Sequence, residues 1–287
     1  MGRPLCEASP SARDVFARAD AVLGFPLARL CFEGPEEELK LTANTQPAIL
    51  THSIAALEDL RARSPEKIGG ATHAAGHSLG EYSACVAAGA LAFEDALSLV
   101  RRRGELMQEA VPAGEGAMAA ILGLPAQEVE RCCREEARGE VVAPANYNSP
   151  EQTVIAGHAA AVERASAACV ARGAKRAVPL PVSAPFHSPL MRPAREAMQE
   201  LLARAQFSDP AMPVVTNVDA QPVADAAGLR DALVRQIDSP VRWVESVRRL
   251  AAEGVDRGLE IGPGNVLAGL VKRIDRSIRV ESWAGGA

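Results

Sequence analysis

The segment Gly76-His77-Ser78-Leu79-Gly80-Glu81 has the G-x-S-x-G pattern of a nucleophile elbow. Such an elbow places a serine on a sharp turn between a strand and a helix, which exposes its hydroxyl and aims the next backbone N–H at a developing oxyanion. Glycines flank the serine because the turn has no room for larger side chains. The segment therefore predicts an α/β fold, with a strand entering the turn and a helix leaving it.

Strands and helices alternate on both sides of this elbow, and one region has an order of its own. Residues 113–184 read as strand, helix, strand, strand, helix and strand, which is the ferredoxin-like split unit. We predict an open, mostly parallel sheet with helices on both faces, formed by residues 1–112 and 185–287, with the small βαββαβ subdomain inserted. The strand that enters the elbow is expected over Ile68–Ala75.

Composition and charge exclude several classes of protein. The 287 residues include 31 Lys and Arg against 36 Asp and Glu, a net charge of −5, whereas nucleic-acid binders usually carry a basic surplus. No apolar run approaches the roughly 18 residues that a membrane-spanning helix needs, and the N-terminus lacks a signal sequence. The cysteines form no C-x-x-C pair, so we expect buried free thiols in a reducing cytoplasm, without disulfides or a bound metal.

A serine nucleophile needs a base, and five histidines compete for this role. We choose His187, because it lies in the rigid loop Ser183–Pro189 that re-enters the large subdomain, and functional residues favour loops held by a scaffold. No Asp stands out as its partner. A backbone carbonyl near Gly262-Pro263-Gly264-Asn265 is one candidate to hold the imidazole, although this segment also fits an ordinary strand–helix turn.

Arg101, Arg102 and Arg103 occupy consecutive positions of an expected helix, about 100° apart around its axis. At most one of them can point into a pocket. A buried arginine beside a serine nucleophile suits a substrate carboxylate, which it grips through two parallel hydrogen bonds.

Several segments then match one family together and in order. The chain resembles the malonyl-CoA:acyl carrier protein transacylases, the acyltransferases of fatty-acid synthesis, over nearly its whole length. The matching segments are Asn44–Ala48 (NTQPA), Gly76–Ala84 (GHSLGEYSA), Arg103-Gly104 with Met107-Gln108, Asn146–Ser149 (NYNS), Val182–His187 (VSAPFH) and Gly262–Leu267 (GPGNVL).

The resemblance implies a ping-pong transfer of a malonyl group. Ser78 attacks malonyl-CoA with His187 as base, and the phosphopantetheine thiol of acyl carrier protein then takes the malonyl group from Ser78. Arg103 clamps the malonyl carboxylate, the Leu79 N–H is one oxyanion donor, and the Asn265 carbonyl orients the base. No cofactor is implied, and a monomer is expected.

Three further side chains are implied to shape the pocket. Gln46 and Met107 line it. Phe186, next to the base, crowds a 2-methyl substituent and so favours malonyl over methylmalonyl.

Acyl carrier proteins are acidic, which requires a basic docking patch on this chain. The two candidates are Lys272 with Arg273 and Arg276, and Lys175 with Arg176.

The start of the chain departs from the family pattern. Family members open with an apolar strand and a G-Q-G-S-Q loop, whose first Gln helps to shape the oxyanion hole, whereas Met1-Gly2-Arg3 resembles the helix that follows this loop. Either the true start lies upstream, or this is a truncated and impaired protein. A non-catalytic remnant that binds the carrier without turnover is a further alternative. Two further functions fit the same elbow, namely a serine esterase or thioesterase and a discrete acyltransferase that serves a polyketide assembly line.

Overall fold

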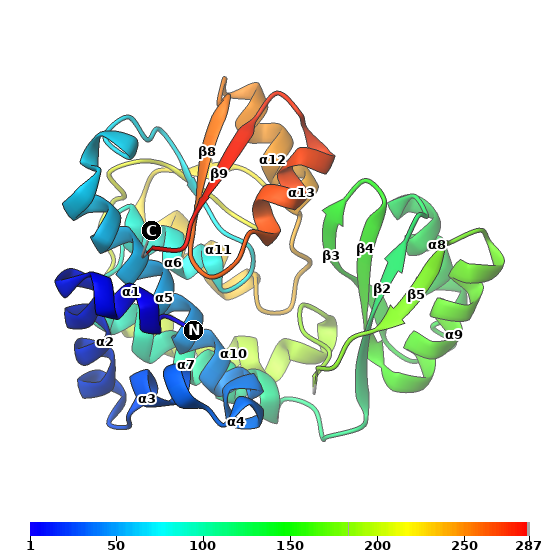
Figure 1. The fold of residues 1–287 in the computed structure, drawn as a ribbon. Helices are drawn as coiled ribbons and strands as arrows, with labels where there is room; N and C mark the ends of the chain where they lie inside the picture. Colours follow the sequence, from blue (N-terminus) through cyan, green and yellow to red (C-terminus); the bar gives the residue numbers. More distant parts are fainter. Residues whose placement is uncertain (183, 286–287) are drawn as a thin grey trace.

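Two lobes lie side by side in the computed structural model, which describes residues 1–182 and 184–285 (Figure 1). Ser183, within the matching segment Val182–His187, and residues 286–287 of the predicted large subdomain lie outside the described residues. The chain passes once from the large lobe into the small lobe and once back. The α/β class is confirmed.

Helices dominate the large lobe. The long helix α5 (Thr42–Arg63) runs through its core and packs against α2 (Pro10–Leu23) and α7 (Phe93–Glu109). Helix α2 begins at the cap Ser9, whose hydroxyl accepts from the Ala12 N–H, and it ends at a left-handed glycine, Gly24. The other helical segments of this lobe are α1 (Arg3–Ala8), α3 (Leu27–Glu33), α4 (Glu36–Lys40), η1 (Pro65–Lys67), α6 (Gly80–Ala87), η2 (Pro189–Met191), α10 (Arg192–Arg204), α11 (Ala226–Arg235), α12 (Trp243–Ala252) and α13 (Val266–Ile274).

The strands of the large lobe are shorter than expected and form two separate small sheets. In one, β1 (Ala74–Ala75) pairs in parallel with β6 (Val214–Val215), which pairs antiparallel with β7 (Pro222–Val223). In the other, β8 (Arg257–Ile261) pairs in parallel with β9 (Arg279–Trp283). The strand that enters the elbow is therefore only two residues long.

The expected strand over Ile68–Ala75 fails at its start for a local reason. The segment directly follows η1 and begins with turns in which the N–H groups of Ile68 and Gly69 both bond to the Pro65 carbonyl. Gly69 and Gly70 also have low strand propensity, so nothing in the sequence opposes these turns.

The small lobe has the predicted βαββαβ order. Its sheet runs β3-β4-β2-β5, all antiparallel, and α8 and α9 pack on one face around a core that includes three cysteines. All six cysteines are buried and free, as expected. The elements are β2 (Gly116–Leu122), α8 (Ala126–Glu136), β3 (Val142–Ser149), β4 (Gln152–His158), α9 (Ala159–Ala171) and β5 (Arg176–Pro179).

Strand β3 joins the two lobes beside the elbow. The Tyr147 N–H donates to the Val241 carbonyl over 2.9 Å, and the Val241 N–H donates to the Ala145 carbonyl over 2.9 Å. Next to this bridge, the imidazole of His77 bonds to the Asn148 amide oxygen at 2.8 Å. The elbow therefore lies where the lobes meet, with α12 and α13 facing β3 (Figure 1). Among the described residues, no helix is both long enough and apolar enough to cross a bilayer.

Candidate active site

The elbow holds Ser78 in a strained conformation. Its φ is 51°, in the left-handed region that residues with side chains rarely adopt. A Cβ on Gly76 would lie 1.9 Å from the Gly80 carbonyl oxygen, so only glycine fits there. Asn217 fastens the turn from the other side, because its amide oxygen accepts from the Ser78 N–H at 2.6 Å and its amide nitrogen donates to the Gly76 carbonyl at 2.7 Å.

His187 lies against the serine hydroxyl, as the sequence predicts. Its Nε2 is 2.7 Å from Ser78 Oγ, and its Nδ1 is 2.9 Å from the backbone carbonyl of Gln236. The predicted partner, the Asn265 carbonyl, is wrong. That carbonyl accepts from the Gly269 N–H at the start of α13 and so faces into its own helix. A carbonyl does orient the base, but it comes from the end of α11.

The carbonyl also decides which nitrogen of His187 carries the proton. A carbonyl oxygen can only accept, so Nδ1 must donate, and the lone pair of Nε2 is left facing Ser78 Oγ. Burial, helped by the positive charge of Arg103, lowers the pKa of His187 to about 3. The imidazole is therefore neutral at physiological pH, which is the state that a general base requires.

Arg103 is the arginine that points inward. Its side chain is 2% exposed, and it donates to Gln46 Oε1 at 2.6 Å, to Gln236 Oε1 at 2.9 Å and to Ser78 Oγ at 3.1 Å. These acceptors are all neutral. No ion pair to Arg103 exists within the described part of the chain, and its buried Nε has no partner there. Burial lowers the pKa of Arg103, opposed by Tyr82 and Glu81. Within the described residues, the site therefore holds a cation with no directly bonded carboxylate, and Glu81 is an acidic group close enough to act on it through its charge.

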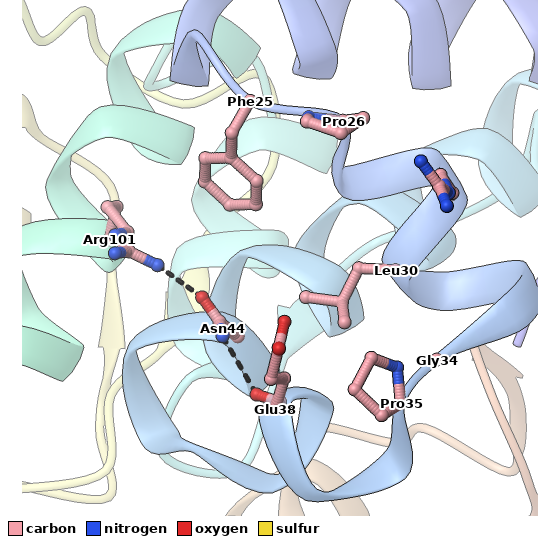
Figure 2. Close-up of a pocket in the computed structure, with 9 residues that line it drawn as sticks. Phe25, Pro26, Leu30, Gly34, Pro35, Glu38, Asn44 and Arg101 are labelled. Carbon is pink, nitrogen blue, oxygen red and sulfur yellow. Dashed lines mark hydrogen bonds between the residues drawn. The ribbon is translucent and has the colours of Figure 1, made fainter.

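The neighbouring arginines have structural contacts instead. Arg101 bonds to Glu105 and Asn44 and stacks over the ring of Phe25 at 5.2 Å. Arg101, Phe25 and Asn44 line a separate hollow of about 480 Å³, in which Asn44 in turn donates to the Glu38 carbonyl (Figure 2). Arg102 is exposed and pairs with Glu105. The expectation that one arginine at most enters the pocket agrees with this arrangement.

Three further predicted site residues are Leu79, Met107 and Phe186. The Leu79 N–H has no hydrogen-bond acceptor within residues 1–182 and 184–285, as an oxyanion donor requires. Met107 is buried one turn beyond Arg103 on α7. Phe186 packs against the large-lobe core and also against the small-lobe cluster around Met118 and Ala120. The lining roles of Met107 and Phe186 stay predictions.

Sequence reasoning missed three polar residues that hold the site together: Glu81, Asn217 and Gln236. The side chain of Gln236 bonds to Arg103, to the Ser78 carbonyl and to Glu81, while its backbone orients His187. Burial raises the pKa of Glu81 to about 7, against the opposing effect of its hydrogen bonds to Gln236 and Asn217. Only Glu81 carried a local signal, because it directly follows the elbow.

Comparison with known proteins agrees with this geometry. Residues 1–284 match the family described as the acyl transferase domain. The chain belongs to this acyl transferase family. It is 54% identical over 267 residues to the malonyl CoA-acyl carrier protein transacylase of Salmonella typhimurium, an alignment that covers 92% of this chain and 85% of that protein. The chain is therefore an acyltransferase.

Solved structures of similar proteins share its fold. An acyl carrier protein S-malonyltransferase from Vibrio cholerae superposes with a TM-score of 0.93 at 46% identity, covering 98% of this acyltransferase and 91% of that chain. A malonyl-transacylase in complex with a type II polyketide acyl carrier protein superposes with a TM-score of 0.95 at 49% identity, covering 99% and 91%.

Proposed function

We propose that this acyltransferase moves the malonyl group of malonyl-CoA to the phosphopantetheine thiol of acyl carrier protein through a malonyl-Ser78 intermediate, and so supplies fatty-acid synthesis. The observation that carries the proposal is the buried guanidinium of Arg103, 3.1 Å from the nucleophile and without an acidic partner in the described structure. A buried charge is costly unless it is paired, so the substrate is expected to bring the anion. A malonyl group carries a carboxylate two bonds from its thioester carbonyl.

In the first half of the reaction, the neutral imidazole of His187 takes the Ser78 hydroxyl proton through Nε2 as Oγ attacks the thioester carbonyl. The tetrahedral oxyanion forms beside the Leu79 N–H, which stabilises its charge. The C–S bond then breaks, and His187 returns the proton to the departing CoA sulfur. Malonyl-Ser78 remains, with its carboxylate on Arg103.

In the second half, the phosphopantetheine thiol of the carrier occupies the place of CoA. His187 takes the thiol proton, the sulfur attacks the malonyl-serine ester, and the proton returns to Ser78 Oγ as the ester bond breaks. The enzyme is restored, and no cofactor enters the proposed cycle. We place the reaction in fatty-acid synthesis rather than at a polyketide assembly line, and turnover on carriers from the two pathways distinguishes these assignments.

A serine esterase is the second enzyme class that the elbow allows. It would use water as acceptor and would gain nothing from a buried arginine within reach of its nucleophile. Its histidine would normally bond to an acid. Here the partner of His187 Nδ1 is a neutral carbonyl, at 2.9 Å. Both features favour acyl transfer from an acidic thioester.

We propose that the carrier docks on the exposed cations Lys272, Arg273, Arg276 and Arg279, called here the α13 patch. No ion pair involves any of them within the described residues, and three of them line a groove of about 630 Å³ between α13 and β9. An acidic partner complements such a surface. In the other candidate, Lys175 with Arg176, the Lys175 side chain is paired with Glu151 at 3.7 Å.

We further propose that the enzyme acts in the cytoplasm as a monomer. Its six free buried thiols fit a reducing compartment. Its exposed large apolar side chains, such as Leu41, Val170 and Val266, come from separate elements rather than from one apolar face.

Intact-mass spectrometry after incubation with malonyl-CoA tests the proposed function. We expect the mass of one malonyl group on the wild-type protein, none on Ser78→Ala, and loss of the adduct when carrier protein is added. Rapid hydrolysis of neutral esters with no malonyl adduct on a folded sample would reject the proposal in favour of an esterase.

A further inference from the structure

A buried carboxylate lies directly behind the elbow. Glu81, three residues after Ser78 and in the first turn of α6, has no solvent-exposed surface. It forms no ion pair within the described residues, and its atom Oε1 has no hydrogen-bond partner there. A carboxylate in such surroundings destabilises a fold unless its contacts compensate, so the remaining oxygen must carry the compensating bonds.

The hydrogen bonds of this carboxylate within the described structure all involve the atom Oε2. It accepts from the backbone N–H of Asn217 at 3.0 Å and from the side-chain Nε2–H of Gln236 at 2.8 Å. The two donors belong to distant parts of the chain, one in the turn after β6 and the other at the end of α11. One oxygen atom therefore connects three elements of the large lobe.

Each of the two partners touches the reacting groups directly. Asn217 holds the backbone of Ser78 through its amide oxygen. Gln236 holds the imidazole of His187 through its backbone carbonyl and the guanidinium of Arg103 through its side-chain oxygen. The nucleophile, the base and the arginine are therefore all held by residues that Glu81 holds.

We propose that Glu81 is a positioning residue, whose Oε2 atom fixes Asn217 and Gln236 and thereby sets the mutual geometry of Ser78, His187 and Arg103. Glu81 itself does not touch the substrate. Its effect on Arg103 rests on the proposed malonyl transfer, whereas its effect on Ser78 and His187 needs only a serine nucleophile.

The bonding pattern predicts which replacements the site tolerates. A glutamine at position 81 can place its oxygen at the Oε2 position and accept both hydrogen bonds, with its NH₂ at the already unpartnered Oε1 position. A methionine has a similar length but accepts neither bond, so Asn217 and Gln236 are left with unpaired buried donors. The comparison of these two variants isolates the hydrogen-bond acceptor from the shape of the side chain.

The test measures single-turnover acylation of Ser78 by malonyl-CoA and by acetyl-CoA, together with the unfolding temperature. We expect Glu81→Gln to keep most of the wild-type acylation rate. Glu81→Met should lose about 100-fold, the effect of misplacing reacting groups by roughly an ångström, and should also lose its preference for malonyl over acetyl. Loss of stability alone lowers the unfolding temperature but leaves the rate constant of the folded enzyme unchanged.

A matched control removes a buried carboxylate elsewhere in the same lobe. Asp59 on α5 is fully buried and pairs with Arg63 at 2.8 Å. We expect Asp59→Asn to acylate at the wild-type rate.

A folded Glu81→Met protein with the wild-type rate, or an equal loss in Glu81→Gln and Glu81→Met, would overturn the proposal. If Glu81→Met does not fold, Glu81→Asp replaces it, because its carboxylate stops one methylene short; a wild-type rate there overturns the proposal equally.

A fluorophosphonate separates the positioning role from the proposed function. It labels a serine that is activated by histidine and carries no carboxylate for Arg103 to bind. We expect Glu81→Met to react more slowly with this reagent than the wild-type enzyme, even if malonyl-CoA proves to be the wrong substrate. Failure of malonylation in the wild-type protein would reject the proposed function, whereas unchanged fluorophosphonate labelling in Glu81→Met would reject the positioning role.

Discussion

Arg103 Nη2 lies 3.1 Å from Ser78 Oγ, so the group proposed to bind the substrate carboxylate also touches the nucleophile. The same nitrogen bonds to Gln236, whose backbone orients His187. Selection of the acyl group and activation of the serine therefore share one hydrogen-bond network. A substrate whose carboxylate binds Arg103 is therefore held within reach of the Ser78 hydroxyl.

We expect Arg103→Ala to lose discrimination between malonyl-CoA and acetyl-CoA. A charge-assisted hydrogen bond contributes about 1.5–3 kcal/mol, so kcat/KM for malonyl-CoA should fall at least ~10-fold more than kcat/KM for acetyl-CoA. Rates of Ser78 acylation with both thioesters measure this ratio. Arg102→Ala, which removes the exposed neighbour, should leave both rates unchanged. An unaltered ratio in Arg103→Ala would show that the guanidinium does not bind the carboxylate.

We expect His187 to stay neutral well below the usual titration range of histidine. Its pKa of about 3 lies below the ordinary value of 6.5, so lowering the pH from 7 to 5 should leave the imidazole unprotonated. NMR of histidine-labelled protein over this range measures the charge state, and His187→Ala identifies the signal. A midpoint between pH 6 and 7 for that signal would contradict the buried, neutral base.

The features of the site that depend on local sequence were predicted correctly. The pattern around Ser78 placed the serine on its turn, and the consecutive arginines required that one at most point inward. The choice of His187 succeeded, because the chain that returns to the large lobe places its Nε2 2.7 Å from Ser78 Oγ. The βαββαβ order was recognisable because its six elements follow one another along the chain, and because β3 and β4 pair as a hairpin.

The partners of the base could not be predicted, because they depend on tertiary packing. Gln236 is 49 residues from His187, and its backbone carbonyl carries no sequence signal at all. Asn265 was a reasonable candidate by composition, but its carbonyl is used inside α13. The segment Ile68–Ala75 failed because turns around Gly69 take up its first half. In each case, contacts that only the folded chain creates decided the outcome.

We expect charge reversal on the α13 patch to weaken the carrier half of the reaction alone. Lys272→Glu combined with Arg273→Glu should raise KM for acyl carrier protein several-fold, more strongly at low salt, because exposed charges are screened by ions. Acylation by malonyl-CoA should keep its rate. Lys175→Glu combined with Arg176→Glu, the other predicted patch, serves as the matched comparison. An equal effect of the two changes would argue against docking at α13.

The two elbow glycines should respond oppositely to alanine. A Cβ on Gly76 would lie 1.9 Å from the Gly80 carbonyl oxygen and 2.8 Å from the Glu81 nitrogen, so Gly76→Ala must open the turn that holds Ser78. We expect this variant to lose Ser78 acylation and several degrees of unfolding temperature. A Cβ on Gly80 meets no described atom within 4 Å, so the expectation that the turn has no room for a larger side chain is wrong at this position. Gly80 lies at the start of α6, where alanine favours the helix. Gly80→Ala should therefore fold and acylate normally, and an inactive Gly80→Ala would show that the turn needs flexibility rather than space.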